Sequence, residues 1–458
     1  MSVDISLSKE QLALFEFLEK ESDHVFVTGR AGTGKSTLLS YFVDNTQKNV
    51  AVVAPTGVAA YNVGGQTIHS FFNVPFNVVY GVTPLAKHLH GRTRDILRSI
   101  DTLVIDEVSM VDADLMDAID TMFQIARGRT KGPFGGVQIV LFGDPYQLSP
   151  VPIKKDIEGY DYYVETYRSP WFFDAKVWRE AKLLRYELHE NFRQHDEEFI
   201  GILNAIRDGS VTQSMLDRLN AAGNRYPENP DVIRLSGVNN RVNNHNASRL
   251  ANIPGITKTF EASIPIGELK NFGANPPADV ALQLKVGAQV MFIKNDDQST
   301  TKTDAGMTRR WVNGTIGHVT EIVSHNHVKV EVDGEELDVH PSSWEKIRYS
   351  IEENFDEATN RFKEVLVPET MAEFRQIPLR LAWAITVHKS QGMTYDEVVV
   401  ELGGGAFAAG QTYVALSRVR TLEGLYLTAP ITLRDVMVDA NVKRFMEEAE
   451  SPRYEGLF

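Results

Sequence analysis

Short, almost wholly apolar segments alternate with longer amphipathic segments over the first third of the chain. Four apolar runs have the length of strands, at residues 24–28, 50–54, 102–106 and 137–142. Such runs are typical of strands that are buried on both faces of a parallel sheet. The segments 8–20 and 37–45 between them have a helical pattern of apolar positions. The alternation predicts an α/β fold for this part of the chain.

A second α/β pattern begins near residue 186 and is interrupted by a segment of different character. Residues 186–315 and 376–458 again alternate strand-like and helix-like segments. Between them, residues 316–375 contain short alternating runs separated by His-Asn and Asp-Gly turn signals, which are typical of antiparallel hairpins. The pattern predicts a first α/β lobe over 1–185, a second over 186–315 and 376–458, and a small β-barrel inserted over 316–375.

Residues 70–100 also interrupt the rhythm of the first lobe. This segment carries four basic side chains against one acidic side chain, namely Lys87, Arg92, Arg94 and Arg98 against Asp95. The whole chain, in contrast, has 47 basic and 61 acidic residues and a formal net charge of −14. That net charge argues against a wholly basic nucleic-acid binder. It does not exclude a locally basic groove, because the electrostatic potential at a binding site depends on where the charges lie. The insertion is therefore either a nucleic-acid contact or a basic surface loop.

Length and composition bound the remaining classes of protein. The 458 residues suffice for about three domains, and 43% apolar and 24% charged residues are ordinary for a globular protein. The chain has no cysteine, which excludes disulfides, zinc ribbons, iron–sulfur clusters and thiol catalysis. The first residues lack a basic region followed by an apolar core, and no apolar run approaches 18 residues. We therefore expect a cytoplasmic protein with no signal peptide and no membrane partner.

The clearest chemical motif directly follows the first apolar run. Gly29 to Ser36 read Gly-Arg-Ala-Gly-Thr-Gly-Lys-Ser, which matches the phosphate-binding loop pattern. Glycines let backbone N–H groups curl around phosphates, and the next helix points its positive end at them. Lys35 is expected to hold the β- and γ-phosphates of ATP, and the Ser36 hydroxyl to complete the shell of Mg²⁺. A plain glycine turn is the alternative. The predicted ATP-binding residues here are Gly29, Ala31, Gly32, Thr33, Gly34, Lys35, Ser36 and Thr37.

An acidic pair ends the third apolar run. Ligands bind at the carboxyl ends of strands in open α/β sheets, which is where Asp106 and Glu107 lie. We expect Asp106 to hold Mg²⁺ with Ser36, and Glu107 to polarise the attacking water. Gln147 follows the fourth run and is placed to orient water or to sense the γ-phosphate. A helix N-cap with a first-turn acid, and an amide beside a turn, are the structural alternatives.

From Leu7 to about Leu427 the chain carries a series of motifs in a fixed order. Besides the motifs above, these are 54–60 (APTGVAA), 66–72 (QTIHSFF), 132–138 (GPFGGVQ), 187–194 (ELHENFRQ), 287–295 (GAQVMFIKN), 313–317 (NGTIG), 381–394 (LAWAITVHKSQGMT) and 412–420 (TYVALSRVR). In kind and order they resemble the motifs of superfamily-one 5′→3′ DNA helicases of the petite-integration-frequency (PIF) family, with RecD-type helicases as more distant relatives. The segment GPFGGVQ is particularly similar to this family.

The resemblance implies an ATP-driven motor with two RecA-like P-loop NTPase lobes that share one nucleotide site. Arg193 and Arg418 match the two arginines that contact the γ-phosphate, for which a salt bridge within the second lobe is the structural alternative. Gln11 matches the glutamine that reads adenine, and Gly392 also belongs to the implied ATP site. The family has a strand-separating wedge at the position of residues 70–100 and a small SH3-like barrel at the position of 316–375.

The resemblance also implies contacts with single-stranded DNA from both lobes. The matching positions are Thr56, Gly57 and His69 in the first lobe and Asn239, His388, Lys389, Ser390 and Gln391 in the second. The segment around Asn239 departs from the family pattern because it lacks the usual Thr-Asn pair. A packed or surface histidine is the alternative for His69. Phe76 is a candidate stacking or wedge aromatic, whereas we expect Phe71 and Phe72 to belong to the core.

These observations favour an ATP-dependent DNA helicase that translocates 5′→3′ and unwinds duplexes. One alternative is a nucleic-acid-stimulated ATPase that binds or remodels DNA without processive unwinding. Another is a P-loop ATPase that acts on protein or a small molecule, which the second-lobe arginines disfavour. The expected partners are single-stranded DNA and forked or tailed duplex DNA, with G-quadruplex DNA left open. We expect a monomer because both halves of the ATP site lie in one chain.

Overall fold

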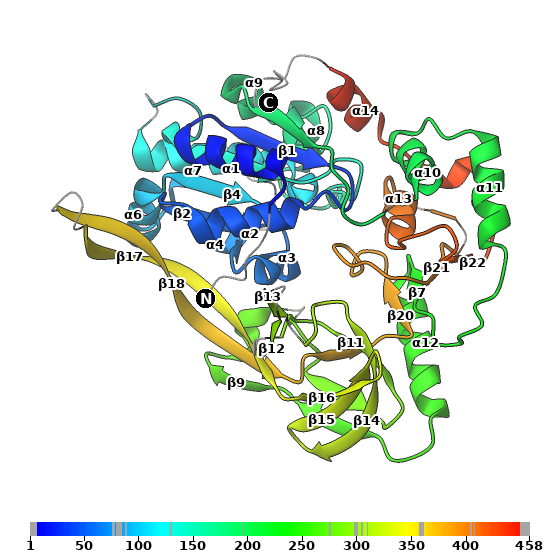
Figure 1. Cartoon of the computed structure of the whole chain (residues 1–458). Coiled ribbons are helices and arrows are strands. Elements are labelled where there is room, and N and C mark those ends of the chain that lie inside the picture. Colours follow the sequence, from blue (N-terminus) through cyan, green and yellow to red (C-terminus); the bar gives the residue numbers. More distant parts are fainter. Residues whose placement is uncertain are drawn as a thin grey trace.

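The computed structural model describes residues 7–75, 78, 85–87, 89–128, 131–194, 196–273, 276–296, 301–303, 306–308, 310–356, 361–403, 405–406 and 408–448. A parallel sheet forms the centre of its first lobe. Its six strands lie in the order β3-β2-β4-β5-β1-β6 (Figure 1). The strands are β1 (Val25–Gly29), β2 (Val50–Ala54), β3 (Gln66–Thr67), β4 (Thr102–Ile105), β5 (Gln138–Phe142) and β6 (Leu184–Leu188). Every residue of β1, β4 and β5 is buried, which explains their continuous apolar sequences.

Helices cover both faces of this sheet. On one face α1 (Lys9–Lys20) and α2 (Lys35–Asn45) share a core with alternate residues of the central strands. On the other face α7 (Ala113–Arg127) packs against the remaining strand residues. The other helices of the lobe are α3 (Gly57–Asn62), α4 (Ile68–Phe72), α6 (Gly91–Ser99), α8 (Tyr160–Thr166) and α9 (Lys176–Ala181).

The second lobe is built on a four-stranded parallel sheet in the order β20-β7-β21-β22. The strands are β7 (Arg234–Ser236), β20 (Ala384–Thr386), β21 (Val398–Glu401) and β22 (Leu425–Leu427). The helices around it are α10 (Glu197–Asp208), α11 (Gln213–Gly223), α12 (Asn239–Asn252) and α13 (Gln411–Leu416). Two parallel sheets flanked by helices confirm the predicted α/β class with RecA-like lobes.

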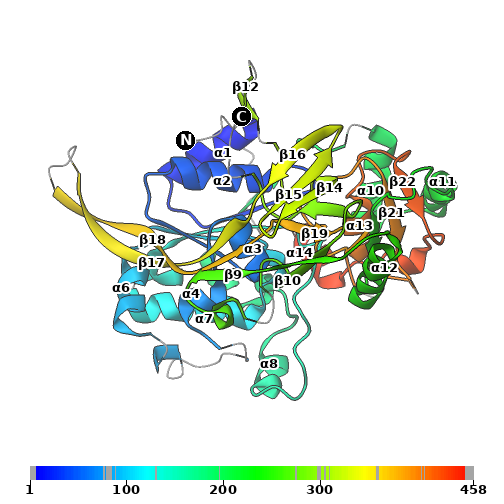
Figure 2. The same cartoon turned by 90° about the horizontal axis from the view of Figure 1, so that it is seen from below.

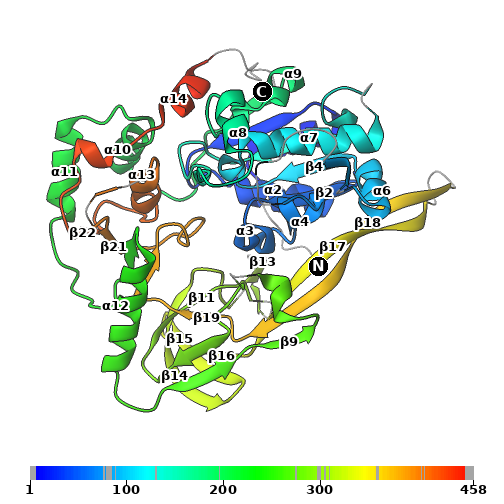
Figure 3. The same ribbon diagram turned by 180° about the vertical axis from the view of Figure 1, so that it is seen from behind.

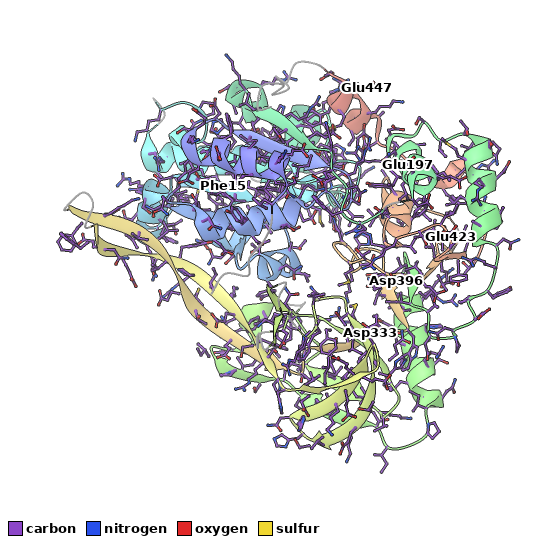
Figure 4. The ribbon with its side chains drawn as sticks, in the orientation of Figure 1. Phe15, Glu197, Asp333, Asp396, Glu423 and Glu447 are labelled. Carbon is purple, nitrogen blue, oxygen red and sulfur yellow. The ribbon has the colours of Figure 1, made fainter. Side chains whose placement is uncertain are left out.

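Two expected boundaries differ from the structure. Strand β6 crosses the boundary placed between 185 and 186, because it pairs in parallel with β1 and completes the sheet of the first lobe. The C-terminal segment 376–458 was assigned to the second lobe, but α14 (Ala440–Glu447) returns to the first (Figure 3). The Phe445 ring stacks on Phe173 with a centroid distance of 4.1 Å, and Arg185 donates to the Phe445 carbonyl. Glu447 marks the end of this helix in Figure 4.

The β insertion also has different limits from the predicted barrel over 316–375. A five-stranded antiparallel sheet has the order β16-β15-β14-β11-β19. Its strands β14 (Ile316–Ser324), β15 (His327–Val332) and β16 (Glu335–Val339) lie in the expected range, but β11 (Gln289–Phe292) and β19 (Leu379–Leu381) flank that range. These outer strands complete the sheet because they bring the chain into the insertion and out of it. Two short pairs, β8 (Lys258–Glu261) with β10 (Ala281–Leu284) and β12 (Thr301–Thr303) with β13 (Gly306–Thr308), lie nearby.

The rest of the insertion is a long hairpin rather than part of a compact barrel. Its strands β17 (Ser342–Asp356) and β18 (Arg361–Gln376) pair with β9 (Ser263–Ile266) at the base, and the hairpin runs along the first lobe towards α6 (Figure 2). The Tyr349 hydroxyl accepts a hydrogen bond from the Val52 amide at 3.0 Å, and Glu369 forms an ion pair with Arg92. The hairpin therefore joins the β insertion to the first lobe.

The described part of the 70–100 segment is integrated into the first lobe. Leu97 of α6 is fully buried in the main core. Arg127 donates to the carbonyls of Leu97, Arg98 and Ile100, and so holds the end of α6. Phe71 and Phe72 are buried in the same core, as expected. In the part of the chain that the structure describes, no helix has the length and apolar character needed to cross a bilayer.

Candidate nucleotide site and nucleic-acid contacts

A cavity of about 660 Å³ lies between residues of the two lobes. The loop between β1 and α2, with Glu107 and Gln147, provides the first-lobe side. The second-lobe side is lined by Gln391, Gly392, Thr394, Arg418, Arg420 and Thr421. Phe192 and Arg193 also line the cavity, and their backbone packs against the phosphate-binding loop. The cavity brings together five of the predicted catalytic residues from separate motifs, namely Lys35, Glu107, Gln147, Arg193 and Arg418.

The glycines of the first-lobe loop are required by its conformation and by close packing. Gly32 and Gly34 have φ values of +88° and +75°, in the left-handed region that favours glycine. A Cβ atom on Gly32 would also lie 2.6 Å from the Cβ of Arg193. Lys35 opens α2 and donates from Nζ to the carbonyls of Gly29 at 2.6 Å and Arg30 at 2.9 Å. Burial lowers the pKa of Lys35 to about 8.

The acidic pair lies at the carboxyl end of β4, as predicted. Glu107 has a φ of +50° and turns its side chain into the cavity, whereas the preceding Asp106 is outside the lining. Burial raises the pKa of Asp106 to about 6. Burial, together with the charge of Asp106, raises the pKa of Glu107 to about 8.

The predicted Mg²⁺ ligands have suitable chemistry. Among the described residues no group of three or more acidic or histidine side chains is arranged to hold a metal ion. Mg²⁺ prefers oxygen ligands, and commonly takes one or two protein oxygens together with phosphate oxygens and water. The carboxylate of Asp106 and the exposed hydroxyl of Ser36 fit that mode of binding.

An unexpected glutamine from the second lobe reaches the catalytic side chains. Gln391 follows β20, and its Nε2 donates to Glu107 Oε2 at 3.0 Å and to Gln147 Oε1 at 3.3 Å. The Gln147 amide in turn donates to Asp144 Oδ2 at 3.2 Å. Gln391 was predicted to contact DNA, but its side chain lies in the nucleotide cavity.

The two predicted arginines enter the cavity from opposite ends of the second-lobe sequence. Arg193 donates to the carbonyls of Ser417 and Gly392, each at 3.2 Å. Arg418 is almost fully buried, and donates to the carbonyls of Val414, Ser390 and Met393. Its described hydrogen bonds and ion pairs include no carboxylate of the second lobe. Burial and the nearby Arg193 lower the pKa of Arg418 to about 9, so the guanidinium stays charged at pH 7.

Gln11 lies beside the phosphate-binding loop, where an adenine-reading role would require it. Its Nε2 donates to the carbonyls of Thr33 and Gly34, and its Oε1 accepts from the Ser8 amide in a capping box. Phe192 was not singled out from the sequence. Its ring is 49% exposed and lines the same cavity next to Gly34. Its position within the motif NFRQ is the sequence signal that could have identified it.

Two contacts between the lobes were also missed. Arg207 of α10 forms a buried bidentate ion pair with Asp144, with its Nη2 3.0 Å from Oδ1 and its Nε 3.3 Å from Oδ2. Burial alone would lower the pKa of Arg207, but the charge of Asp144 outweighs this effect and raises that pKa above its ordinary value. The Tyr413 hydroxyl of α13 accepts a hydrogen bond from the Ala31 amide at 2.9 Å. Both contacts fix the phosphate-binding side of the cavity to the second lobe.

The predicted DNA contacts of the first lobe follow β2 and β3. Thr56 caps α3 through a hydrogen bond from the Ala59 amide, and Gly57 is the first residue of that helix. His69 lies on α4, where burial lowers its pKa. Phe76 lies outside the described residues.

In the second lobe, the predicted contacts differ in their exposure. His388 and Lys389 are exposed, and Asn239 is exposed at the start of α12. Ser390 is fully buried, and its hydroxyl donates to the Val387 carbonyl. His388 and Lys389 therefore form the accessible part of this turn, while Ser390 and Gln391 lie within it.

Comparison with known proteins identifies similar chains along the whole sequence. The PIF1-like helicase family matches residues 6–216. The chain is 32% identical over 456 residues to the ATP-dependent DNA helicase Pif1 of Bdellovibrio bacteriovorus, covering 98% of this chain and 93% of that one. It is 35% identical over 428 residues to the ATP-dependent DNA helicase PIF1 of Rattus norvegicus, covering 92% of this chain and 60% of that one. The chain thus spans about 60% of the length of the vertebrate relatives it matches.

Solved structures of a Bacteroides Pif1 share the fold at 33% identity. The complex of that protein with ADP-AlF4 has a TM-score of 0.84 and covers 97% of both chains. Its unliganded structure has a TM-score of 0.82, covering 98% of this chain and 99% of that one. Its structure bound to single-stranded DNA has a lower TM-score of 0.65, covering 96% of both chains. The arrangement of this chain is therefore more similar to the unliganded form than to the DNA-bound form.

Proposed function

Because this chain belongs to the PIF1-like helicase family, we propose that it is an ATP-dependent DNA helicase that moves 5′→3′ on single-stranded DNA. The observation that supports this proposal most directly is the cavity between the lobes. A phosphate-binding loop forms one side of it and Arg418 lines the second-lobe side, while Arg193 packs beside Gly32 and donates to the second-lobe carbonyls of Ser417 and Gly392. A site that needs both lobes links the chemistry of ATP to their relative position.

The residues of the cavity have distinct roles in this proposal. The backbone of the loop and Lys35 bind the phosphates, and Asp106 and Ser36 hold Mg²⁺, which would neutralise charge on the β- and γ-phosphates. Glu107 accepts a proton from the attacking water, and Gln147 orients that water. Arg193 and Arg418 stabilise negative charge on the γ-phosphate oxygens in the transition state.

Further ATP contacts surround these groups. Gln11 reads the adenine edge, and the exposed ring of Phe192 provides a face on which the base stacks. Loop residues Gly29, Ala31, Gly32, Thr33 and Gly34, with Thr37 and Gly392, line or support the phosphate path. Support for these roles comes from their positions around one cavity or directly behind it.

The proposed DNA contacts follow the carboxyl ends of parallel strands in both lobes, where those of the second lobe are exposed and those of the first are half-buried. His388, Lys389 and Asn239 in the second lobe, with Thr56 and His69 in the first, are proposed to bind single-stranded DNA. Forked or tailed duplexes, and G-quadruplexes, are the proposed structures that the motor opens, with residues 70–100 at the point of separation. A monomer suffices for the motor because both halves of its ATP site belong to one chain.

Strand separation and ATP hydrolysis by the same preparation test the proposal. The substrates are a duplex with a 5′ single-stranded tail, the same duplex with a 3′ tail, and a blunt duplex. We expect ATP hydrolysis to rise with a single-stranded oligonucleotide, and strand separation to require ATP and the 5′ tail. Glu107→Gln serves as the control for contaminating activity. Separation that is equal with a 3′ tail would contradict the polarity, and stimulated hydrolysis without separation would favour the alternative of a DNA-binding ATPase.

A further inference from the structure

We propose that Gln391 restrains the catalytic carboxylate of Glu107 in the absence of DNA, and that DNA bound at His388 and Lys389 withdraws it. The inference rests on the proposed helicase function and adds a residue that links DNA binding to ATP hydrolysis. It follows from the two hydrogen bonds of Gln391 Nε2, to Glu107 Oε2 at 3.0 Å and to Gln147 Oε1 at 3.3 Å.

The chemistry of this contact opposes hydrolysis. A carboxylate that acts as a base must offer an oxygen to the water molecule whose proton it takes. The amide of Gln391 donates to Glu107 Oε2 and so occupies the oxygen that would otherwise be open to that water. The same amide also engages the oxygen of Gln147, the other group placed to orient water. The single amide of Gln391, from the second lobe, therefore donates to both Glu107 and Gln147.

The turn that carries Gln391 connects this contact to the exposed DNA-binding positions. His388 and Lys389 are exposed, whereas Ser390 is fully buried between them and Gln391. The turn is held by hydrogen bonds from the Ser390 amide to the Thr386 carbonyl at 3.0 Å and from the Gln391 amide to the His388 carbonyl at 3.3 Å. Because these bonds tie the exposed and inner residues together, a shift of Lys389 towards a phosphate moves Gln391 as well.

Two further observations agree with a resting arrangement. Two cationic side chains of the cavity donate to backbone carbonyls: Lys35 to those of Gly29 and Arg30, and Arg193 to those of Ser417 and Gly392. The arrangement of the chain is also more similar to the DNA-free Bacteroides structures, with TM-scores of 0.82 for the unliganded form and 0.84 for the ADP-AlF4 complex, than to the complex with single-stranded DNA, with a TM-score of 0.65.

The test replaces Gln391 by methionine, which has a similar volume but no amide donor. Steady-state ATP hydrolysis is measured without DNA and with a saturating oligothymidylate. A hydrogen bond to a charged group corresponds to about a ten- to hundredfold change in an equilibrium. We therefore expect Gln391→Met to raise the DNA-free kcat by about tenfold or more, while the DNA-saturated kcat stays within about threefold of that of the unchanged protein.

Gln391→Ala provides a second variant, and Gln213→Met a matched control. Gln213 lies on α11, far along the chain from the cavity, and donates to Asp217; its substitution should alter neither kcat. A parallel fall of both kcat values in the Gln391 variants would assign the side chain to catalytic positioning and overturn the restraint. Unchanged values would reduce its role to packing and also overturn it. If the unchanged protein itself shows no stimulation by DNA, the proposed function fails instead.

Discussion

Arg193 and Arg418 enter the same cavity but are held in different ways, so their replacement should have different consequences. An arginine that contacts the transferred phosphoryl group is worth about 10³–10⁵ in rate, or about 4–7 kcal/mol of transition-state stabilisation. Arg193→Ala should lower the DNA-stimulated kcat by at least about a hundredfold. Its guanidinium satisfies two carbonyls at the lobe interface, those of Ser417 and Gly392. Because the bond to Gly392 is exposed and that to Ser417 is only partly buried, water can replace them, and stability should change less than on loss of Arg418.

Arg418→Ala should reduce the rate by a similar factor and also lower stability. The guanidinium satisfies the carbonyls of Val414, Ser390 and Met393 inside the second lobe. Leaving a buried polar group unpaired costs about 1–3 kcal/mol, so the loss of this side chain should cost several kcal/mol in unfolding free energy. The side chain also supports the turn that carries Lys389, so affinity for single-stranded DNA should fall in this variant but not in Arg193→Ala.

Three measurements on the same preparations check this contrast. They are steady-state ATP hydrolysis with saturating single-stranded DNA, affinity for a labelled oligonucleotide without nucleotide, and the thermal unfolding midpoint. The expected result for Arg193→Ala is a loss of hydrolysis alone, and for Arg418→Ala a loss in all three. If Arg193→Ala hydrolyses ATP within tenfold of the unchanged protein, its assignment to the γ-phosphate is wrong. If Arg418→Ala unfolds at an unchanged temperature, the structural role derived from its carbonyl contacts is wrong.

Further outcomes follow from Glu107, Lys35 and Lys389. Glu107→Gln should retain ATP binding but lower the rate of hydrolysis by about 10²–10⁴, because it removes the base and leaves the phosphate-binding loop intact. Lys35→Ala should instead weaken ATP binding. Measuring nucleotide affinity by titration, together with the rate of phosphate release, distinguishes these two effects. Burial raises the pKa of Glu107 and lowers the pKa of Lys35, both to about 8, so the DNA-free kcat/KM for ATP should rise towards pH 8 as Glu107 ionises and fall above it as Lys35 loses its charge. A profile without a maximum in this range would contradict the two assignments. Lys389→Ala should reduce the slope of log affinity for single-stranded DNA against log salt by about 0.7, and an unchanged slope would remove Lys389 from the phosphate contacts.

The sequence pattern predicts the central strands of the first lobe because these strands are buried on both faces. Strands β1, β2, β4 and β5 lie within one or two residues of the expected runs. The sixth strand, β6, was not assigned to the first lobe because its partner β1 lies more than 150 residues earlier in the chain. Helix α14 illustrates the same limit. The sequence assigned this segment to the second lobe, and only the tertiary structure shows that Phe445 packs against Phe173 of the first lobe.

In the candidate site, too, residues close together in sequence could be predicted, whereas contacts between residues far apart in sequence could not. The phosphate-binding loop and the acidic pair are recognisable because their residues are adjacent in sequence and follow predicted strands. The ion pair between Asp144 and Arg207 joins residues of different lobes, and no spacing rule connects them. Gln391 belongs to a turn whose neighbours are exposed, so its direction into the cavity depends on the path of the backbone after β20. Residue type and order therefore identify the participants, whereas the folded chain decides which of them meet.

The contacts around the cavity make the nucleotide site a property of the lobe interface rather than of the phosphate-binding lobe. The Ala31 amide is bonded to Tyr413, the Asp144 carboxylate to Arg207, and Glu107 to a glutamine that follows β20. Removing one partner of a buried ion pair costs about 3–5 kcal/mol, because the other charge is left buried and unpaired. Asp144 of the first lobe and Arg207 of the second therefore depend on each other, and any change in the lobe interface that separates them also affects the contacts around the nucleotide cavity.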